Sequence, residues 1–114
     1  FTVDWAMMQN NLANSYYNQI LGYRAENIER AIEYFNQALR VFTLKDFPVD
    51  WAMIQNNLGN AYCNRILGDK AENVEEAIEH YNEALKVRTQ KNFPVEWADT
   101  QNSLVNAYKS RILK

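Results

Sequence analysis

Asparagines recur every four residues in three segments of this sequence, and their amides are the side chains best suited to bind a ligand through hydrogen bonds. On a helical wheel they gather opposite the apolar residues of the same segments, so each segment carries a row of amides. A carboxamide both donates and accepts hydrogen bonds, so such a row can hold a peptide backbone whatever its side chains. The rows are Asn10, Asn14 and Asn18; Asn56, Asn60 and Asn64; and Asn102, Asn106 and Ser110.

Asparagine is a costly choice for the surface of a helix. A face that only meets water usually carries Glu, Lys, Arg or Gln, which favour the helix by roughly 0.5 kcal/mol more per residue. A local preference that is broken repeatedly is a candidate for function. The alternative is structural, with the amides of adjacent helices bonded to one another in a ladder. The two interpretations are compatible.

The sequence contains no recognisable catalytic or metal-binding constellation. His80 is the only histidine and Cys63 the only cysteine, and no Cys, His and Asp cluster has ligand spacing. There is no glycine-rich phosphate loop and no nucleophile elbow. We therefore expect a protein that is not an enzyme and has no cofactor, with His80 as a surface or packing residue.

Composition narrows the range of partners. The formal charge is -2 and the pI about 5.4, which argues against nucleic acid and against acidic membranes, since both attract basic patches. No apolar run approaches the ~20 residues that span a bilayer, and no signal peptide is visible. A single cysteine is compatible with a reducing compartment, so we expect a cytoplasmic location.

An internal repeat organises the whole chain. Phe1, Phe47 and Phe93 begin three units, and the first two units are identical at 29 of 46 positions. We expect a single domain over 1–114, with repeat 1 at 1–46, repeat 2 at 47–92 and a half repeat at 93–114.

Four acidic residues near the start of the second helix expected in repeat 2 form a solvated face or, alternatively, an acidic docking surface. They are Glu72, Glu75, Glu76 and Glu79.

Each complete unit predicts two helices. In the second unit the first helix is expected at about 49–67, with Pro48 at its start and Gly68 as its left-handed cap. The second is expected at about 73–90, opened by Asn73 and Glu76 in a capping box. The apolar face of the first helix would hold Trp51, Ile54, Leu58, Tyr62 and Ile66. The fold class is therefore all-α, an α-solenoid of antiparallel helix pairs with five helices.

The repeats resemble the tetratricopeptide repeat (TPR). The resemblance lies in a Leu-Gly pair with a tyrosine three residues later, and in alanines and an aromatic at set spacing in the second helix. The matching residues are Leu58, Gly59, Tyr62, Ala77, Tyr81, Ala84 and Leu85. The usual period is 34 residues, and the 46 seen here is similar to a long variant found in bacterial multidomain proteins, some beside caspase-like peptidase domains.

The resemblance implies that the first helices line a concave peptide-binding groove. The positions it implies for contact include most of the asparagines, together with Met53 and Lys109. Because Lys109 is the only lysine or arginine among them, we do not expect recognition of a terminal carboxylate. The predicted function is a scaffold that binds a peptide or protein segment. The alternative is a structural spacer or self-assembling segment of a larger protein.

The ends of the solenoid are the expected sites of self-association. The chain begins without Met, and we read it as a piece of a longer protein. The third unit lacks its second helix, so Trp97, Leu104, Tyr108 and Ile112 are expected to lose cover. We therefore expect a possible homo-oligomer through the exposed ends.

Overall fold

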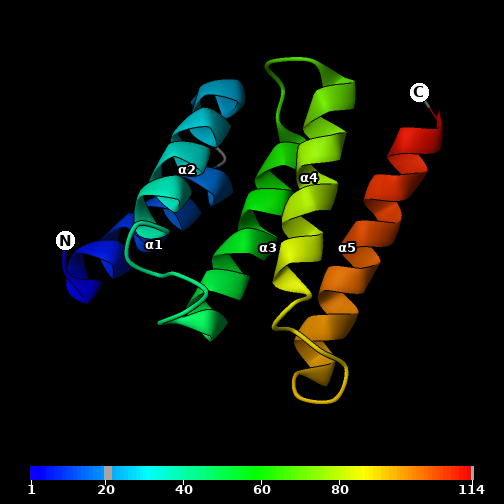
Figure 1. The fold of residues 1–114 in the computed structure, drawn as a ribbon. Helices are drawn as coiled ribbons and strands as arrows, with labels where there is room; N and C mark the ends of the chain where they lie inside the picture. Colours follow the sequence, from blue (N-terminus) through cyan, green and yellow to red (C-terminus); the bar gives the residue numbers. More distant parts are fainter. Residues whose placement is uncertain (20–21, 114) are drawn as a thin grey trace.

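The computed structural model describes residues 1–19 and 22–113, with side chains to Arg111. Over these residues the chain forms five helices and no strand: α1 Val3–Asn18, α2 Arg24–Ala38, α3 Pro48–Asn64, α4 Lys70–Ala84 and α5 Pro94–Leu113. Consecutive helices run antiparallel, and α1 with α2 and α3 with α4 form hairpins (Figure 1). The α5 helix packs against α4. The predicted all-α class with five helices is confirmed.

Local side chains fix where the helices begin. Thr2 caps α1, because its hydroxyl accepts from the backbone N–H of Trp5 at 3.1 Å. Pro48 stands at the first position of α3, as predicted, where a missing N–H costs nothing. Pro94 likewise begins α5.

The predicted start of the second helix in repeat 2 is wrong. Asp69 caps α4 by accepting from the N–H of Ala71 at 2.8 Å, so the helix begins at Lys70 and Asn73 is already inside it. The helix ends at Ala84, and the following residues form turns rather than helix to 90.

The first helix of repeat 2 also ends earlier than predicted. The α3 helix stops at Asn64, so Ile66 lies in the loop and is 59% exposed instead of joining the apolar face. Gly68 does have a positive φ of 83°, but it stands in this loop rather than directly after the helix.

Two apolar clusters hold the helices together. The first joins α1, α2 and α3 through Phe35, Phe42, Ile54 and Leu58 with several alanines. The second joins α4 and α5 through Val74, Ile78, Tyr81 and Leu104. These residues are between 0% and 7% exposed, so the clusters supply the main driving force for folding.

Gly59 allows one close approach in the second repeat. A methyl group at this position would lie 2.5 Å from Cε1 of Tyr81, much closer than carbon atoms can pack. In the first repeat the corresponding pair is Ala13 and Phe35, so that repeat accommodates a methyl group where the second does not.

Exposure at the ends of the solenoid agrees with the prediction for Tyr108 and for the half-buried Trp97 but not for Leu104. Leu104 is only 7% exposed because α4 covers it, whereas Tyr108 is 38% exposed; the side chain of Ile112 lies outside the described residues. The larger apolar surface lies on α1, where Met8 is 62% and Leu12 39% exposed. Their counterparts in α3, Ile54 and Leu58, pack against the preceding repeat, and no described helix lies on that side of α1.

Candidate peptide-binding surface

The asparagine row of α3 is bonded to hydroxyl groups of three other helices. The Thr100 hydroxyl of α5 donates to Oδ1 of Asn56 at 2.9 Å. The Tyr81 hydroxyl of α4 donates to Oδ1 of Asn60 at 2.6 Å. Nδ2 of Asn64 donates to the Tyr17 hydroxyl of α1 at 2.7 Å. The amides of the central repeat therefore connect helices, but their partners are hydroxyls rather than other amides.

These bonds connect α3 to the first helix of each of the other two units. Asn64 bonds to Tyr17 of α1, and Asn56 bonds to Thr100 of α5. Burial raises the pKa of the Tyr17 phenol, although the bond from Asn64 acts in the opposite direction. The hydroxyl therefore stays protonated and can donate as well as accept.

The corresponding amide of α1 lacks such a partner. Asn10 is buried, at 9% exposed, and its Oδ1 has no hydrogen-bond partner among the described residues. The repeat explains the difference, because the position equivalent to Thr100 is Ile54, which cannot donate. An apolar side chain at that position leaves the amide oxygen of Asn10 unsatisfied.

The remaining predicted contact residues are mostly exposed. Asn102, Asn106 and Lys109 are exposed on α5, and Asn18 is exposed at the end of α1. Asn14 is half-buried. Met53 is half-buried and lines a pocket of about 180 Å³ between α3 and the start of α5. The predicted residues thus lie on α1, α3 and α5, and those on α5 are all exposed.

Sequence reasoning missed the hydroxyl partners and two helix-end cations. Arg24 donates from Nη1 to the carbonyl oxygen of Tyr17 and lies over its ring, 5.1 Å from the ring centroid. At the equivalent place Lys70 lies 3.5 Å from the carbonyl oxygen of Cys63. A cation there satisfies the last carbonyls of the helix. The recurrence of a basic residue 46 positions apart was the available signal.

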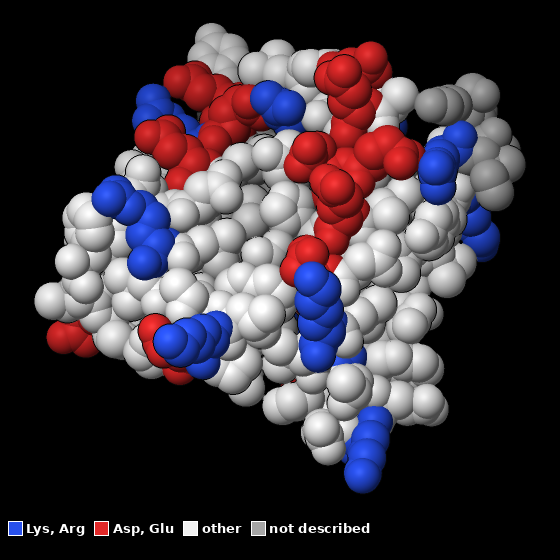
Figure 2. All heavy atoms as spheres, in the orientation of Figure 1, with Lys and Arg blue, Asp and Glu red and all other residues white. Residues whose placement is uncertain are grey.

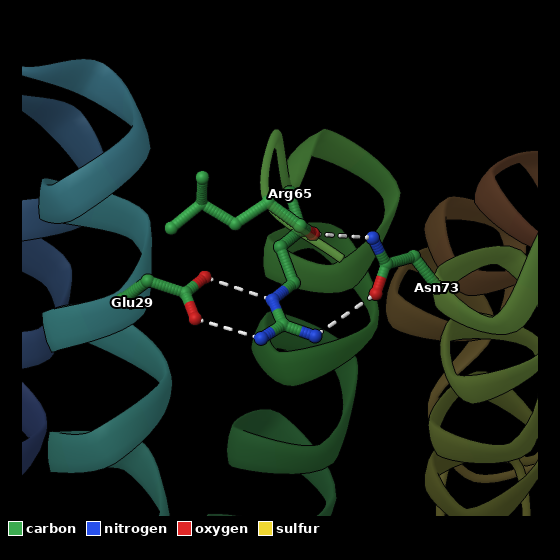
Figure 3. A network of polar contacts seen from close by, with 4 residues as sticks. Glu29, Arg65 and Asn73 are labelled. Atoms are coloured by element: carbon green, nitrogen blue, oxygen red, sulfur yellow. Dashed lines mark hydrogen bonds and ion pairs between the residues drawn. The ribbon is translucent and has the colours of Figure 1, made fainter. Parts of the chain in front are cut away.

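A second missed feature is a network around Arg65 (Figure 3). Its guanidinium donates twice to Glu29 of α2, from Nε at 2.8 Å and from Nη2 at 2.7 Å, and once to Oδ1 of Asn73 at 3.1 Å. Nδ2 of Asn73 in turn donates to the carbonyl oxygen of Leu67 at 2.9 Å. The bond to Glu29 raises the pKa of Arg65. This network explains why Asn73 does not cap α4: its amide holds the preceding loop.

Acidic side chains gather over the upper part of α4 (Figure 2). Those on its exposed face are Glu72, Glu75, Glu76 and Glu79. Glu75 is paired with Arg111 at 3.0 Å, and Glu76 lies 3.8 Å from Nε2 of His80. Exposure of these carboxylates is compatible with both predictions, a solvated face and an acidic docking surface.

His80 packs within the second repeat. Its ring stacks on Tyr62 with centroids 5.4 Å apart, and Nδ1 lies 2.6 Å from Oε1 of Gln55. Burial lowers its pKa, against the smaller opposing effect of Glu76.

In residues 1–19 and 22–113, no three His, Cys, Asp or Glu side chains are grouped so that they could hold a metal ion. None of the described helices combines the length and apolar character needed to cross a bilayer.

Comparison with known families gives one result that covers most of the chain. The sequence profile of the soluble NSF attachment protein (SNAP) family matches residues 4–109. Comparisons with curated proteins and with solved structures give no significant match.

Proposed function

The chain belongs to the soluble NSF attachment protein family, and we propose that it acts as a non-enzymatic scaffold holding a peptide or protein segment against α1, α3 and α5. A helical, TPR-like fold and a role in protein interaction are the general properties of this family. The proposal adds the surface: the side of the three first helices that carries the asparagine rows.

The observation that carries the proposal is the way α3 is joined to both neighbours. Asn64 and Asn56 bond to Tyr17 of α1 and Thr100 of α5, which supports a single binding surface over the three helices. Asn102 and Asn106 continue the row on α5 as exposed amides, and Lys109 lies beside them. Rigid elements with exposed donors and acceptors suit recognition of a backbone, because little order has to be gained on binding.

Selection of peptides tests this proposal. The immobilised chain would select from a displayed library of random 12-residue peptides, and affinities of enriched peptides would be measured by fluorescence anisotropy. We expect the double variant Asn102→Ala/Asn106→Ala to weaken binding at least tenfold. The matched control is Asn36→Ala, which removes an amide that is also exposed, from α2. No enriched peptide, or equal losses in both variants, would count against the amide surface.

A structural spacer is the second candidate, and one observation favours it. The amides of Asn56, Asn60 and Asn64 are bonded within the protein, as expected if the rows serve mainly to align helices. On this view Asn56→Ala would lower stability, while Asn102→Ala would change neither stability nor binding. The effect of Asn102→Ala on peptide binding separates the candidates, because both predict the same stabilities.

The wider context is also part of the proposal. A 46-residue TPR-like repeat is similar to those of bacterial multidomain arrays, so we propose that the chain works as a segment of such an array. In that setting its ends contact further repeats and its asparagine side faces the partner.

A further inference from the structure

The pocket beside Met53 lies between two repeats. Residues of α3 form one wall, and the α4–α5 connection with Glu96 of α5 forms the other. The lining residues are Val49, Ala52, Met53, Val87, Arg88, Phe93 and Glu96. The pocket is partly enclosed, lined mainly by apolar atoms, and has a volume of about 180 Å³. An engineered apolar cavity of about 150 Å³ in another protein binds benzene, so a phenyl ring is within the capacity of this one.

The first repeat has the same positions but fills the space itself. The counterpart of Arg88 is Phe42, which is 3% exposed and clusters with Ala6, the counterpart of Ala52. Its ring also meets Phe47, the counterpart of Phe93, edge-on at 5.4 Å between centroids. The chain therefore already shows which side chain these walls accommodate.

A paired exchange of residues explains why the second repeat leaves the space open. Arg88 replaces Phe42 and Thr100 replaces Ile54, so an apolar pair becomes a polar one. Nη1 of Arg88 donates to the Thr100 hydroxyl at 3.3 Å, and that hydroxyl donates to Asn56. The guanidinium is held by this chain of bonds and does not fill the apolar space that a ring occupies in the first repeat.

We infer that this pocket receives one apolar side chain, up to the size of phenylalanine, from the segment that the scaffold binds. The inference rests on the proposed function and makes it more specific. Met53 is one helical turn from Asn56, so a segment lying along the amides reaches the pocket directly. The amides would hold the backbone, and the pocket would select the side chain.

A small probe tests the pocket without any knowledge of the partner. The chain has three methionines, and with ¹³C-methyl labelling Met53 reports on the pocket while Met7 and Met8 of α1 serve as internal references. The probe is N-acetyl-phenylalanine N-methylamide, and N-acetyl-alanine N-methylamide is its control. We expect a saturable shift of the Met53 signal with the phenylalanine probe only, and unchanged signals of Met7 and Met8.

Variants that fill the pocket complete the test. Arg88→Phe copies the first repeat, so its ring should shift the Met53 signal in the free protein and abolish the response to the probe. Lys86→Phe adds the same ring at an exposed position two residues away and should leave the response intact. If Arg88→Phe does not fold, Val49→Phe introduces a ring from the opposite wall.

The outcomes separate the pocket from the amide surface. An unmoved Met53 signal at millimolar probe, or an undiminished response in the filled variant, overturns the pocket. If Met53 responds to the probe but the selected peptides bind the Asn102→Ala/Asn106→Ala variant as tightly as the wild type, the pocket is supported and the amide surface is rejected.

Discussion

Arg65 and Glu29 join two repeats through a two-pronged ion pair, and the same pair recurs one repeat later. Arg111 follows Glu75 by the same 36 residues and lies 3.0 Å from it. The pair in the first junction is about 30% exposed at both side chains, and it carries an additional bond to Asn73. An ion pair with this geometry contributes more than an ordinary surface pair because both guanidinium prongs and a third donor are used.

Substitution of Arg65 tests this contribution. We expect Arg65→Ala to lower the free energy of unfolding by about 1–2 kcal/mol, measured by urea denaturation, because three hydrogen bonds are lost. Arg30→Ala breaks an exposed pair with Glu26 within α2 and should cost below about 0.5 kcal/mol. Equal effects of the two substitutions would show that the junction gains nothing from the network.

Gly59 should resist replacement by alanine. In the interior of a helix this change ordinarily stabilises by roughly 1 kcal/mol. Here the new methyl group meets the ring of Tyr81, so we expect Gly59→Ala to lower the free energy of unfolding by about 1–3 kcal/mol.

The first repeat supplies the control for this substitution. Tyr81→Phe removes the bond to Asn60 and recreates the Ala13–Phe35 pairing when combined with Gly59→Ala. The ring is then free to shift, so alanine should cost less in this background. A cost that is the same in both backgrounds would exclude the anchored tyrosine as the cause.

His80 should make stability depend on pH. Its pKa in the folded protein is below the ordinary 6.5, since burial disfavours the charged ring, so the unfolded chain binds more protons between the two values. Stability is therefore full above pH 6.5 and decreases as the pH falls towards the folded pKa. Thermal unfolding from pH 7.5 downwards would measure the slope. His80→Tyr copies the Tyr16–Tyr34 stack of the first repeat and should flatten this part of the profile.

The exposed side of α1 should cause self-association. Met8 and Leu12 occupy the positions where Ile54 and Leu58 pack on a neighbouring repeat, so a second copy can cover them. We expect light scattering to show association at high concentration, and Met8→Glu/Leu12→Glu to restore a monomer. Val95→Glu, at an equally exposed site on α5, should leave association unchanged. A wild-type monomer at all concentrations would contradict this expectation.

Sequence periodicity was enough to predict the helices but not their polar contacts. Pro48 and the apolar spacing of Ile54 and Leu58 are local signals, and both predicted α3 correctly near its start. Asn73 was predicted as the cap because Glu76 follows it at capping-box spacing, but the cap is Asp69, a residue with the same capping chemistry four positions earlier. The local sequence pattern cannot distinguish two such caps, because the choice depends on a contact with the preceding loop, in which Arg65 donates to the side chain of Asn73.

The asparagine rows show the same limit more clearly. Their side of the helix follows from spacing alone, but their partners depend on how the helices are rotated against one another. Thr100 and Tyr81 became visible as partners of Asn56 and Asn60 only in three dimensions. The recurrence of Glu and Arg at 46-residue spacing, by contrast, was readable from the sequence, and it would have identified the junction pairs.

Because Arg88 and Thr100 stand where the first repeat has Phe42 and Ile54, the strengths of the two junctions should depend differently on temperature. At these positions the first junction is closed by apolar contacts, which strengthen on warming from low temperature. The second junction keeps its apolar cluster between α4 and α5 but has a short chain of hydrogen bonds beside an open pocket at the equivalent positions. Neighbouring repeats unfold as nearly independent units coupled only at their junctions. We therefore expect the start of α5, beside the open pocket, to open locally, so that its backbone amides exchange with deuterium before those of α3.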